Sequence, residues 1–297
     1  PPPTKNFMLR RGFAALRPAL RDGRACVLLR EYSSSSSSET SFGFKTVPSS
    51  QKEGLVAEVF KNVAPSYDVM NDLMSAGLHR LWKDRLVEML APFPGMQHVD
   101  VAGGTGDVAF RILQAMQDKE REVAEQSPAL AAAPGCVTVC DINPAMVEVG
   151  KQRAESQGLT SGLVWSVGNA EQLPIPDSSL DSYTIAFGIR NVTDIDKALR
   201  EAHRVLRRGG RFLCLEFSLV TDPVLRQGYD AYSMNVIPAM GEVVAGDRDS
   251  YQYLVESIRQ FPDQEAFKAK IAAAGFKGVR YENLTQGVVA IHTGFKI

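Results

Sequence analysis

A glycine-rich segment between an apolar run and a helical pattern is the part of the chain best suited to chemistry. Residues 100–107 are Asp-Val-Ala-Gly-Gly-Thr-Gly-Asp. Glycine lets the backbone turn sharply and approach a ligand closely, and the N-terminus of the helix that follows offers unpaired N–H groups. The segment therefore predicts a site for a nucleotide-like cofactor, with Asp100, Gly104 and Thr105 among its contacts.

Two later segments lie where the rest of such a cofactor would need partners. Asp141 ends the next predicted strand, and a carboxylate there can accept hydrogen bonds from both hydroxyls of a ribose. Asn169 and Ala170 follow the third strand, where the edge of an adenine ring would lie. A purely structural glycine turn would not require these positions, so we favour cofactor binding.

Two cofactors fit this layout. Residues 104–109 match G-x-G-x-x-G/A, the dinucleotide fingerprint, which is a weak signal alone. The whole loop more closely resembles D-x-G-x-G-T-G, the S-adenosylmethionine loop of class I methyltransferases, with Ala102 in place of the common glycine. Asp141 also lies further from the glycine loop than the roughly 20 residues typical of a dinucleotide unit. We attribute the extra length to a surface insertion at residues 118–135. S-adenosylmethionine is the favoured cofactor, and NAD-dependent oxidoreduction is the alternative.

Strand-like and helix-like patterns alternate through the body of the protein. The 297 residues are 44% hydrophobic and 23% charged, which excludes a disordered protein. The alternation predicts an α/β fold, a mainly parallel sheet with helices on both faces. The last two of seven strands would form a hairpin, making one strand antiparallel, and residues 219–250 form a helical insertion after the fifth. The predicted strands are 97–102, 136–140, 163–167, 182–187, 211–217, 276–283 and 287–295, and the predicted helices are 107–117, 143–157, 194–206, 251–260 and 263–274.

Four motifs resemble those of the ubiquinone/menaquinone biosynthesis methyltransferases. They are YDVMNDLMSAGLHRLW at 67–82, DVAGGTGD at 100–107, FGIRNV at 187–192 and RVLRRGG at 204–210. The last has Arg208 where proline is usual, a substitution that falls in a turn. The resemblance covers about residues 42–297. It implies a Rossmann-like class I methyltransferase that C-methylates 2-methoxy-6-polyprenyl-1,4-benzoquinol in ubiquinone synthesis, with S-adenosylmethionine as methyl donor.

The implied reaction assigns roles to residues after the fourth strand. A benzoquinol ring carbon becomes a good nucleophile when a ring hydroxyl loses its proton, so the enzyme must align the reacting carbons and stabilise the oxyanion. We expect Arg190 to stabilise that oxyanion, lower the quinol pKa or hold a water that takes the proton, and Asn191 to fix the other ring oxygen. A salt bridge is the structural alternative for Arg190. The reaction needs no metal, and we expect none.

Residues 60–82 would cover the cofactor. We expect Tyr67 to touch its methionine end, and His79 is a candidate base, although a lone histidine is more often structural. The polyprenyl tail requires an apolar groove, and the insertion is our candidate, with ordinary core or a homodimer interface as alternatives. The groove candidates are Tyr229, Tyr232, Met234, Val236, Ile237 and Met240.

The first 32 residues differ from the rest in charge. They hold seven basic and two acidic side chains, whereas the remainder has a net charge of -6 within a total of -1. An Arg-rich, acid-poor segment followed by the serine run 33–38 is typical of a mitochondrial transit peptide, with a basic RNA-binding tail as the alternative. Import accounts for the basic residues without nucleic acid as a partner. We therefore expect a transit peptide at 1–32, a flexible linker at 33–50 and a methyltransferase domain at 51–297.

The expected setting is the mitochondrial matrix, peripheral to the matrix face of the inner membrane. No apolar run reaches the roughly 18 residues of a spanning helix, so contact with the bilayer would be at its surface. The resemblance also implies work with other ubiquinone-biosynthesis proteins in a multi-subunit complex. An S-adenosylmethionine-stabilised structural subunit of that complex is therefore the alternative to an enzyme.

Overall fold

The computed structural model describes residues 39–63, 67–126, 134–159 and 161–297. The expected transit peptide, residues 1–32, lies outside these ranges. The strands are β1 Glu39–Phe42, β2 Lys45–Pro48, β3 Gln97–Val101, β4 Cys136–Asp141, β5 Leu163–Val167, β6 Leu180–Ala186, β7 Leu206–Phe217, β8 Lys277–Leu284 and β9 Val289–Phe295. The helices are α1 Ser49–Val63, α2 Tyr67–Ser75, α3 Leu78–Leu90, α4 Asp107–Gln126, α5 Pro144–Ser156, α6 Ile195–Val205, α7 Pro223–Ala231, α8 Ile237–Ala245, α9 Arg248–Gln260 and α10 Gln264–Ala273, with shorter turns η3 Ile189–Asn191, η4 Tyr232–Val236 and η5 Thr285–Gly287.

The central sheet has the predicted topology. In the described residues, a 7-stranded sheet runs in the order β5-β4-β3-β6-β7-β9-β8. β9 is antiparallel to both of its neighbours, and the other pairings in this sheet are parallel. The prediction of a mainly parallel sheet with one antiparallel strand is confirmed. The strand order reverses between β3 and β6, and open α/β sheets bind ligands at such a switch point, beyond the carboxyl ends of the strands.

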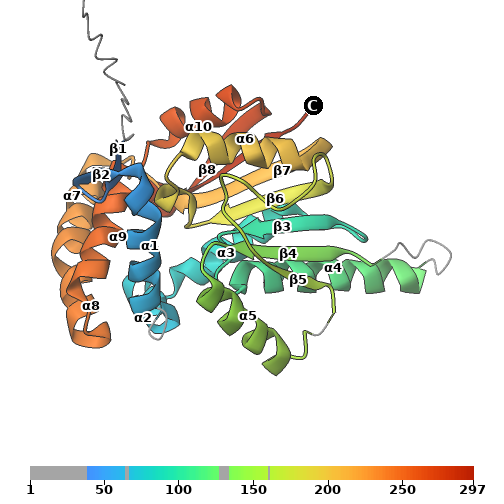
Figure 1. Ribbon diagram of the computed structural model, residues 1–297, viewed down its shortest axis with the longest axis horizontal. Helices are drawn as coiled ribbons and strands as arrows, with labels where there is room; N and C mark the ends of the chain where they lie inside the picture. The colour runs from blue at the N-terminus through green and yellow to red at the C-terminus, as the bar shows by residue number, and fades with distance from the viewer. Residues whose placement is uncertain (1–38, 64–66, 127–133, 160) are drawn as a thin grey trace, which may run out of the picture. The chain divides into compact units, whose positions relative to one another are not determined.

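Helices cover both faces of this sheet (Figure 1). On one face α3 and α4 bury Leu86 and Ile112 against Val139 of β4. On the other face α6 and α10 bury Leu199 and Phe267 in a cluster with Phe212 of β7. Burying both faces explains why the strands are apolar runs rather than alternating patterns.

Helix ends follow capping chemistry that the sequence carries. The Asn143 side chain accepts a hydrogen bond from the backbone N of Ala145 at 2.9 Å, and Pro144 takes the first helical position of α5. Two boundaries differ from expectation by five residues or more: β7 begins at Leu206 rather than at residue 211, and α4 continues to Gln126 through residues 118–126 of the expected surface insertion. Charged side chains solvate an exposed helix as well as a loop, so composition did not separate the two.

The expected linker at residues 33–50 is corrected from residue 39 onward. β1 and β2 pair as an antiparallel hairpin, and residues 49 and 50 open α1. The hairpin packs on α9, where Phe42 stacks on Tyr253 with ring centroids 4.2 Å apart and Glu256 accepts a hydrogen bond from the backbone N of Phe44. The short strands lack an apolar alternation of their own, so their structure depends on this distant helix.

The insertion after the fifth parallel strand is helical, as predicted. α7, η4 and α8 lead into α9, and this group packs against α1 and α2 beside the carboxyl ends of the strands (Figure 1). The hydrophobic cluster at this contact contains the buried residues Val63, Met70, Ile237, Tyr251 and Val255. Within the described residues, every helix is too short or too polar to cross a membrane.

Candidate cofactor and active site

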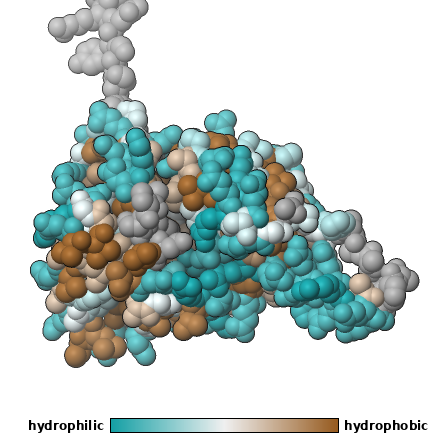
Figure 2. All heavy atoms as spheres, turned by 90° about the horizontal axis from the view of Figure 1, so that it is seen from below, coloured by the Kyte–Doolittle hydropathy of each residue, from teal (hydrophilic) through white to brown (hydrophobic). Residues whose placement is uncertain are grey.

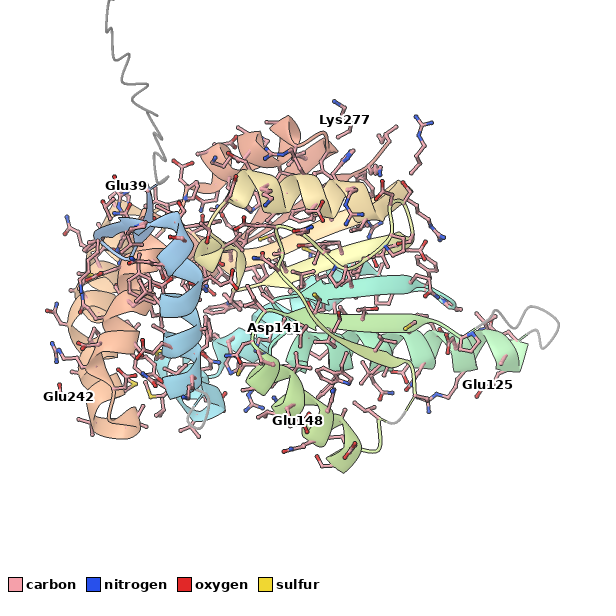
Figure 3. All side chains as sticks on the ribbon, in the orientation of Figure 1. Glu39, Glu125, Asp141, Glu148, Glu242 and Lys277 are labelled. Carbon is pink, nitrogen blue, oxygen red and sulfur yellow. The ribbon has the colours of Figure 1, made fainter. Side chains whose placement is uncertain are left out.

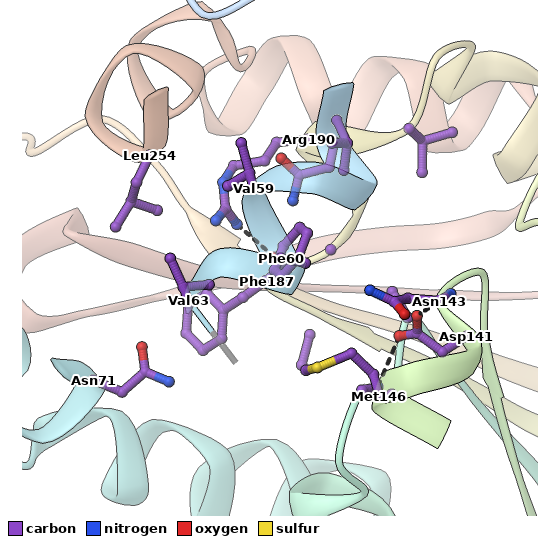
Figure 4. Close-up of a pocket in the computed structure, with 18 of the residues that line it drawn as sticks. Val59, Phe60, Val63, Asn71, Asp141, Asn143, Met146, Phe187, Arg190 and Leu254 are labelled. Carbon is purple, nitrogen blue, oxygen red and sulfur yellow. Dashed lines mark hydrogen bonds between the residues drawn. The ribbon is translucent and has the colours of Figure 1, made fainter. Parts of the chain in front are cut away.

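A cavity of ≈ 250 Å³ lies at the carboxyl ends of the parallel strands. Loops after β3, β4, β5 and β6, with Phe217 at the end of β7, form one wall, and α1, α2, α3 and α9 form the other. Figure 4 shows Asp141 and Met146 toward one end of this cavity, Asn71 and Leu254 toward the other, and Arg190 between them. The cavity therefore has two ends, one at the glycine loop and one at the helical insertion.

The glycine loop folds tightly over the end of β3. Ala102, Gly104 and Gly106 have φ angles of 52°, 54° and 87°, in the left-handed region that favours glycine. The backbone N of Gly104 donates to Asp141 Oδ2 at 2.8 Å, and the backbone N of Asn143 donates to Asp141 Oδ1 at 2.8 Å. Figure 3 shows Asp141 at the end of β4 that faces α1. A carboxylate has about four lone-pair sites, so Asp141 can still accept from ribose hydroxyls.

Asp100 is buried beneath the loop with one oxygen unpaired. The Thr184 hydroxyl donates to Asp100 Oδ1 at 2.7 Å, whereas Oδ2 has no hydrogen-bond partner in the described structure. Burial raises the pKa of Asp100 to about 7. A buried carboxylate oxygen without a donor, lining a cavity, fits the ammonium group of an amino-acid ligand.

Thr105, Asn169 and Ala170 also line the cavity, but the polar side chains of Thr105 and Asn169 already have protein partners. Thr105 Oγ1 accepts from Arg153 Nη1. Asn169 Oδ1 accepts from the backbone N of Glu171 at 2.8 Å, and its Nδ2 donates to Glu53 Oε2 at 3.3 Å. Ala170 is buried in the cavity wall. An adenine ring would therefore meet a segment that the protein already holds in place.

Arg190 is both a cavity residue and a member of a buried ion pair. Its Nη1 donates to Glu216 Oε1 at 2.8 Å and to the backbone O of Phe187 at 2.6 Å, and its side chain is 6% exposed. Its Nε donates to Ser257 Oγ at 3.3 Å. The salt bridge that was the alternative interpretation therefore exists. Burial raises the pKa of Glu216, and the guanidinium opposes that rise.

Asn191 presents an unpaired donor beside Arg190. Its Oδ1 accepts from the Tyr253 hydroxyl at 2.9 Å, while its Nδ2 is buried with no partner in the described residues. Burial raises the pKa of Tyr253 to about 12, so this phenol stays protonated and can only donate to the amide oxygen. The hydrogen bond thereby fixes the amide so that Nδ2 is available to a ligand.

His79 is held by a carboxylate. Its Nε2 lies 2.8 Å from Asp72 Oδ1, and Arg80 donates to both oxygens of that carboxylate. Because a carboxylate only accepts, Nε2 carries the proton and Nδ1 carries the lone pair. Nδ1 is buried with no hydrogen-bond partner in the described structure, and burial lowers the pKa of His79.

Two further expectations concern Tyr67 and a metal ion. The side chain of Tyr67 lies outside the described part, so its contact with the cofactor stays a prediction. Among the described residues, no cluster of three His, Cys, Asp or Glu side chains could hold a metal ion.

Sequence reasoning missed Glu216 and Asp72, although a lone glutamate in the apolar run 211–217 was a usable signal. It also missed the α9 wall and the part of α1 before residue 60, whose cavity residues include Glu53, Val56, Tyr253 and Leu254.

Comparisons of sequence place the protein among known relatives. A model of the ubiE/COQ5 methyltransferase family matches residues 45–296. An Arabidopsis thaliana protein is 60% identical over 260 residues, covering 87% of this chain and 90% of its own length. A Homo sapiens protein is 55% identical over 277 residues, covering 87% and 85%. Both relatives are named 2-methoxy-6-polyprenyl-1,4-benzoquinol methylase, mitochondrial.

Solved structures of low identity share the fold. The [4+2]-cyclase SpnF superposes with a TM-score of 0.55 at 16% identity, covering 81% of this chain and 94% of that one. A SAM-dependent methyltransferase from Thermotoga maritima gives 0.53 at 19% identity, covering 81% and 99%. These two likenesses confirm the Rossmann-like fold alone. The sequence match over nearly the whole described body shows the family: this chain belongs to the ubiE/COQ5 methyltransferase family.

Proposed function

We propose that this protein methylates a ring carbon of 2-methoxy-6-polyprenyl-1,4-benzoquinol in ubiquinone biosynthesis, with S-adenosylmethionine as methyl donor. Relatives that are 53–60% identical carry that enzyme's name. The observation that carries the proposal is the two-ended cavity, which joins the glycine loop to a buried guanidinium, Arg190, and an unpaired amide donor, Asn191 Nδ2.

The glycine-loop end suits the cofactor. Asp100 Oδ2 would receive its ammonium group, the N-terminus of α4 its carboxylate, and Asp141 its ribose hydroxyls. Met146 and Ala170 supply apolar surface for the adenine. When bound, the cofactor supplies an electrophilic methyl group on a sulfonium.

The other end suits a quinol whose oxygens need hydrogen-bond donors. An arginine stays protonated in proteins, so Arg190 acts as a donor and a charge rather than as a base. Its Nη2 makes no hydrogen bond to the described residues and is left for a developing oxyanion, while Asn191 Nδ2 would hold the second ring oxygen. Phe60 and Phe187 line the space between and exclude water (Figure 4), which strengthens both interactions.

His79 is our candidate for the proton acceptor. Its Nδ1 has a lone pair and no described partner, and Asp72 would stabilise the imidazolium that forms. Burial lowers the pKa of His79, which keeps the ring neutral and ready to accept at physiological pH. A small movement of α3 or of the quinol would be needed for contact, because Nδ1 is enclosed in the described structure.

The helical insertion supports a path for the polyprenyl tail. Of the groove candidates, Tyr229 and Ile237 line the cavity, while Val236 is exposed and Tyr232, Met234 and Met240 pack on the α1–α2 side. Exposed apolar side chains gather at the end formed by α2 and α8, brown at the left of Figure 2. They include Val69, Leu73, Val243 and Val244. We propose that the tail leaves here toward the bilayer.

We also propose a cellular location and partners for this protein. Relatives named as mitochondrial support a mitochondrial location, and within it we place the protein at the matrix face of the inner membrane. Other ubiquinone-biosynthesis proteins would be its partners in a complex. A homodimer through the exposed α2–α8 end is the alternative use of that surface.

Arg190→Ala tests the proposed function. We expect S-adenosylmethionine binding by calorimetry to be retained and methyl transfer to a short-tailed methoxybenzoquinol to fall about 100-fold or more, as when an oxyanion donor is removed. The double variant Arg190→Gln/Glu216→Gln covers the case in which an unpaired Glu216 unfolds the single variant. Arg85→Ala, which breaks an ion pair with Glu282, is the matched control. Normal methylation by Arg190→Ala would contradict the role assigned to Arg190.

A further inference from the structure

A series of hydrogen bonds runs through the interior of the sheet beneath the glycine loop. It joins His98 and Asp100 of β3 to Ser182 and Thr184 of β6, on neighbouring parallel strands. His98 Nδ1 lies 2.7 Å from Ser182 Oγ, His98 Nε2 lies 3.0 Å from Thr184 Oγ1, and Thr184 Oγ1 lies 2.7 Å from Asp100 Oδ1. All four side chains are at most 2% exposed.

Chemistry fixes the direction of this hydrogen-bond series. The Thr184 hydroxyl has one proton, and when Asp100 is ionised this proton goes to its carboxylate, which can only accept. The Thr184 oxygen must then accept from His98 Nε2–H, and His98 Nδ1 must accept from the Ser182 hydroxyl, which also lies 3.2 Å from the weaker acceptor Met96 Sδ. Burial lowers the pKa of His98 to about 3, so the ring stays neutral and keeps this single N–H. Every donor in the series therefore points toward Asp100.

The surroundings of Asp100 otherwise oppose its charge. Burial disfavours the carboxylate, and Asp107 on α4 and Asp141 on β4 repel it. Lys83 on α3 attracts it but is itself paired with Asp107 at 2.7 Å. The Thr184 hydrogen bond is thus the direct contact that favours the anion, and it occupies Oδ1 so that Oδ2 is left for a ligand.

We propose that Thr184, supported by His98 and Ser182, is a positioning residue for the amino-acid end of the cofactor, because it favours the ionised form of Asp100 and leaves Oδ2 available to the ammonium group. The inference rests on the proposed function, which places S-adenosylmethionine in this cavity. It assigns a binding role to three residues inside the sheet that touch no ligand themselves.

Thr184→Val is the test, since it keeps the shape and removes the hydroxyl. Loss of a hydrogen bond to a buried carboxylate should raise the pKa of Asp100 by about one unit, which is tenfold in the neutral-to-anion ratio. The measurement is the Kd of S-adenosylhomocysteine by calorimetry from pH 5.5 to 9, expressed as variant over wild type at each pH. We expect a ratio of about ten below pH 6.5 that approaches one near pH 9.

Three controls separate this role from packing. Thr184→Ser restores the hydroxyl and should return the ratio to one at every pH. Thr293→Val removes a buried strand hydroxyl that has no described partner and should also give one. The ligand 5′-methylthioadenosine lacks the amino-acid end, so its Kd should be the same for all variants at all pH values. The titration of Asp141 and of the ligand is common to variant and wild type and cancels in the ratio.

A ratio for Thr184→Val that is flat with pH, or an equal loss of 5′-methylthioadenosine binding, would overturn the inference and leave the proposed function intact. Wild-type protein that binds neither ligand would overturn both. If Thr184→Val fails to fold, His98→Leu gives the same test by removing the donor to Thr184, with an expected ratio of about two to three at low pH and one at high pH.

Discussion

Ala102 and Gly188 touch at the switch point of the sheet, where a Cβ atom added to Gly188 would lie 2.4 Å from the Cβ of Ala102. Ala102 follows β3 and belongs to the glycine loop, whereas Gly188 follows β6 and precedes Arg190. The side chain at position 102 therefore requires glycine at position 188. The loop assigned to the cofactor and the loop assigned to the quinol are packed as one unit.

Gly188→Ala should disturb both ends of the cavity. We expect a loss of about 1–3 kcal/mol in the free energy of unfolding from overpacking, together with weaker S-adenosylhomocysteine binding. Adding Ala102→Gly removes the clash and relieves an alanine at a φ of 52°, so the double variant should recover most of the loss. Urea unfolding and calorimetry measure the two effects. Gly228→Ala, at a helical position with no atom within 4 Å, is the control and should be neutral or slightly stabilising. Additive effects of the two substitutions would contradict the contact.

The sequence predicted those parts of the site that are fixed by local chemistry. Asp100, Asp141 and Arg190 each sit at or just past the end of an apolar run, and parallel strands bring such ends to one edge. Partners that come from distant segments could not be predicted. Glu216 pairs with Arg190 only because β6 and β7 are neighbours, and the β1–β2 hairpin is ordered by α9.

Glu216→Gln tests how Arg190 is held. The substitution keeps the shape but leaves the guanidinium buried without its counter-charge, so we expect the free energy of unfolding to fall by about 3 kcal/mol. Methyl transfer should drop by about tenfold because Arg190 loses its anchor, with the Kd of S-adenosylhomocysteine unchanged. Asp177→Asn breaks an exposed ion pair with Arg204 and should cost under about 1 kcal/mol. A Glu216→Gln enzyme with wild-type stability and rate would refute the anchoring role.

The pH profile of kcat tests the His79–Asp72 pair. If neutral His79 accepts the proton, kcat should fall as pH drops through its pKa, which burial places below the usual value. Asp72 favours the imidazolium, so Asp72→Asn should lower that pKa further and move the acid limb to lower pH, while the plateau falls because the base is weaker. His79→Gln should reduce kcat by about 100-fold and abolish the limb. His203→Gln, on α6, is the control. An unchanged acid limb in His79→Gln would exclude this histidine as the base.

The buried His98 predicts a specific loss of stability in acid. Burial lowers its pKa in the folded protein to about 3, whereas the unfolded state titrates near 6.5. Between these values the unfolded state binds a proton that the native state does not, so the free energy of unfolding falls as pH falls, by about 1.4 kcal/mol per pH unit. His292, with a pKa lowered to about 4, acts in the same direction. Asp100 acts in the opposite direction from about pH 4 to 7, because its raised pKa makes the native state the one that binds the proton.

His98→Leu isolates one of these contributions. The variant should be less stable than wild type by about 1–3 kcal/mol at pH 7, because Ser182 and Thr184 lose a buried hydrogen-bond partner. Its stability should nevertheless fall less steeply in acid. Between pH 6 and 4, the slope of its free energy of unfolding against pH should be smaller than that of wild type by close to one proton, or about 1.4 kcal/mol per pH unit. Urea unfolding at half-unit pH steps measures both quantities. His203→Leu, at a half-buried ring, should change the slope less. Equal slopes for His98→Leu and wild type would mean that His98 takes up its proton in the folded protein, and the directional hydrogen-bond series to Asp100 would then lose its neutral histidine.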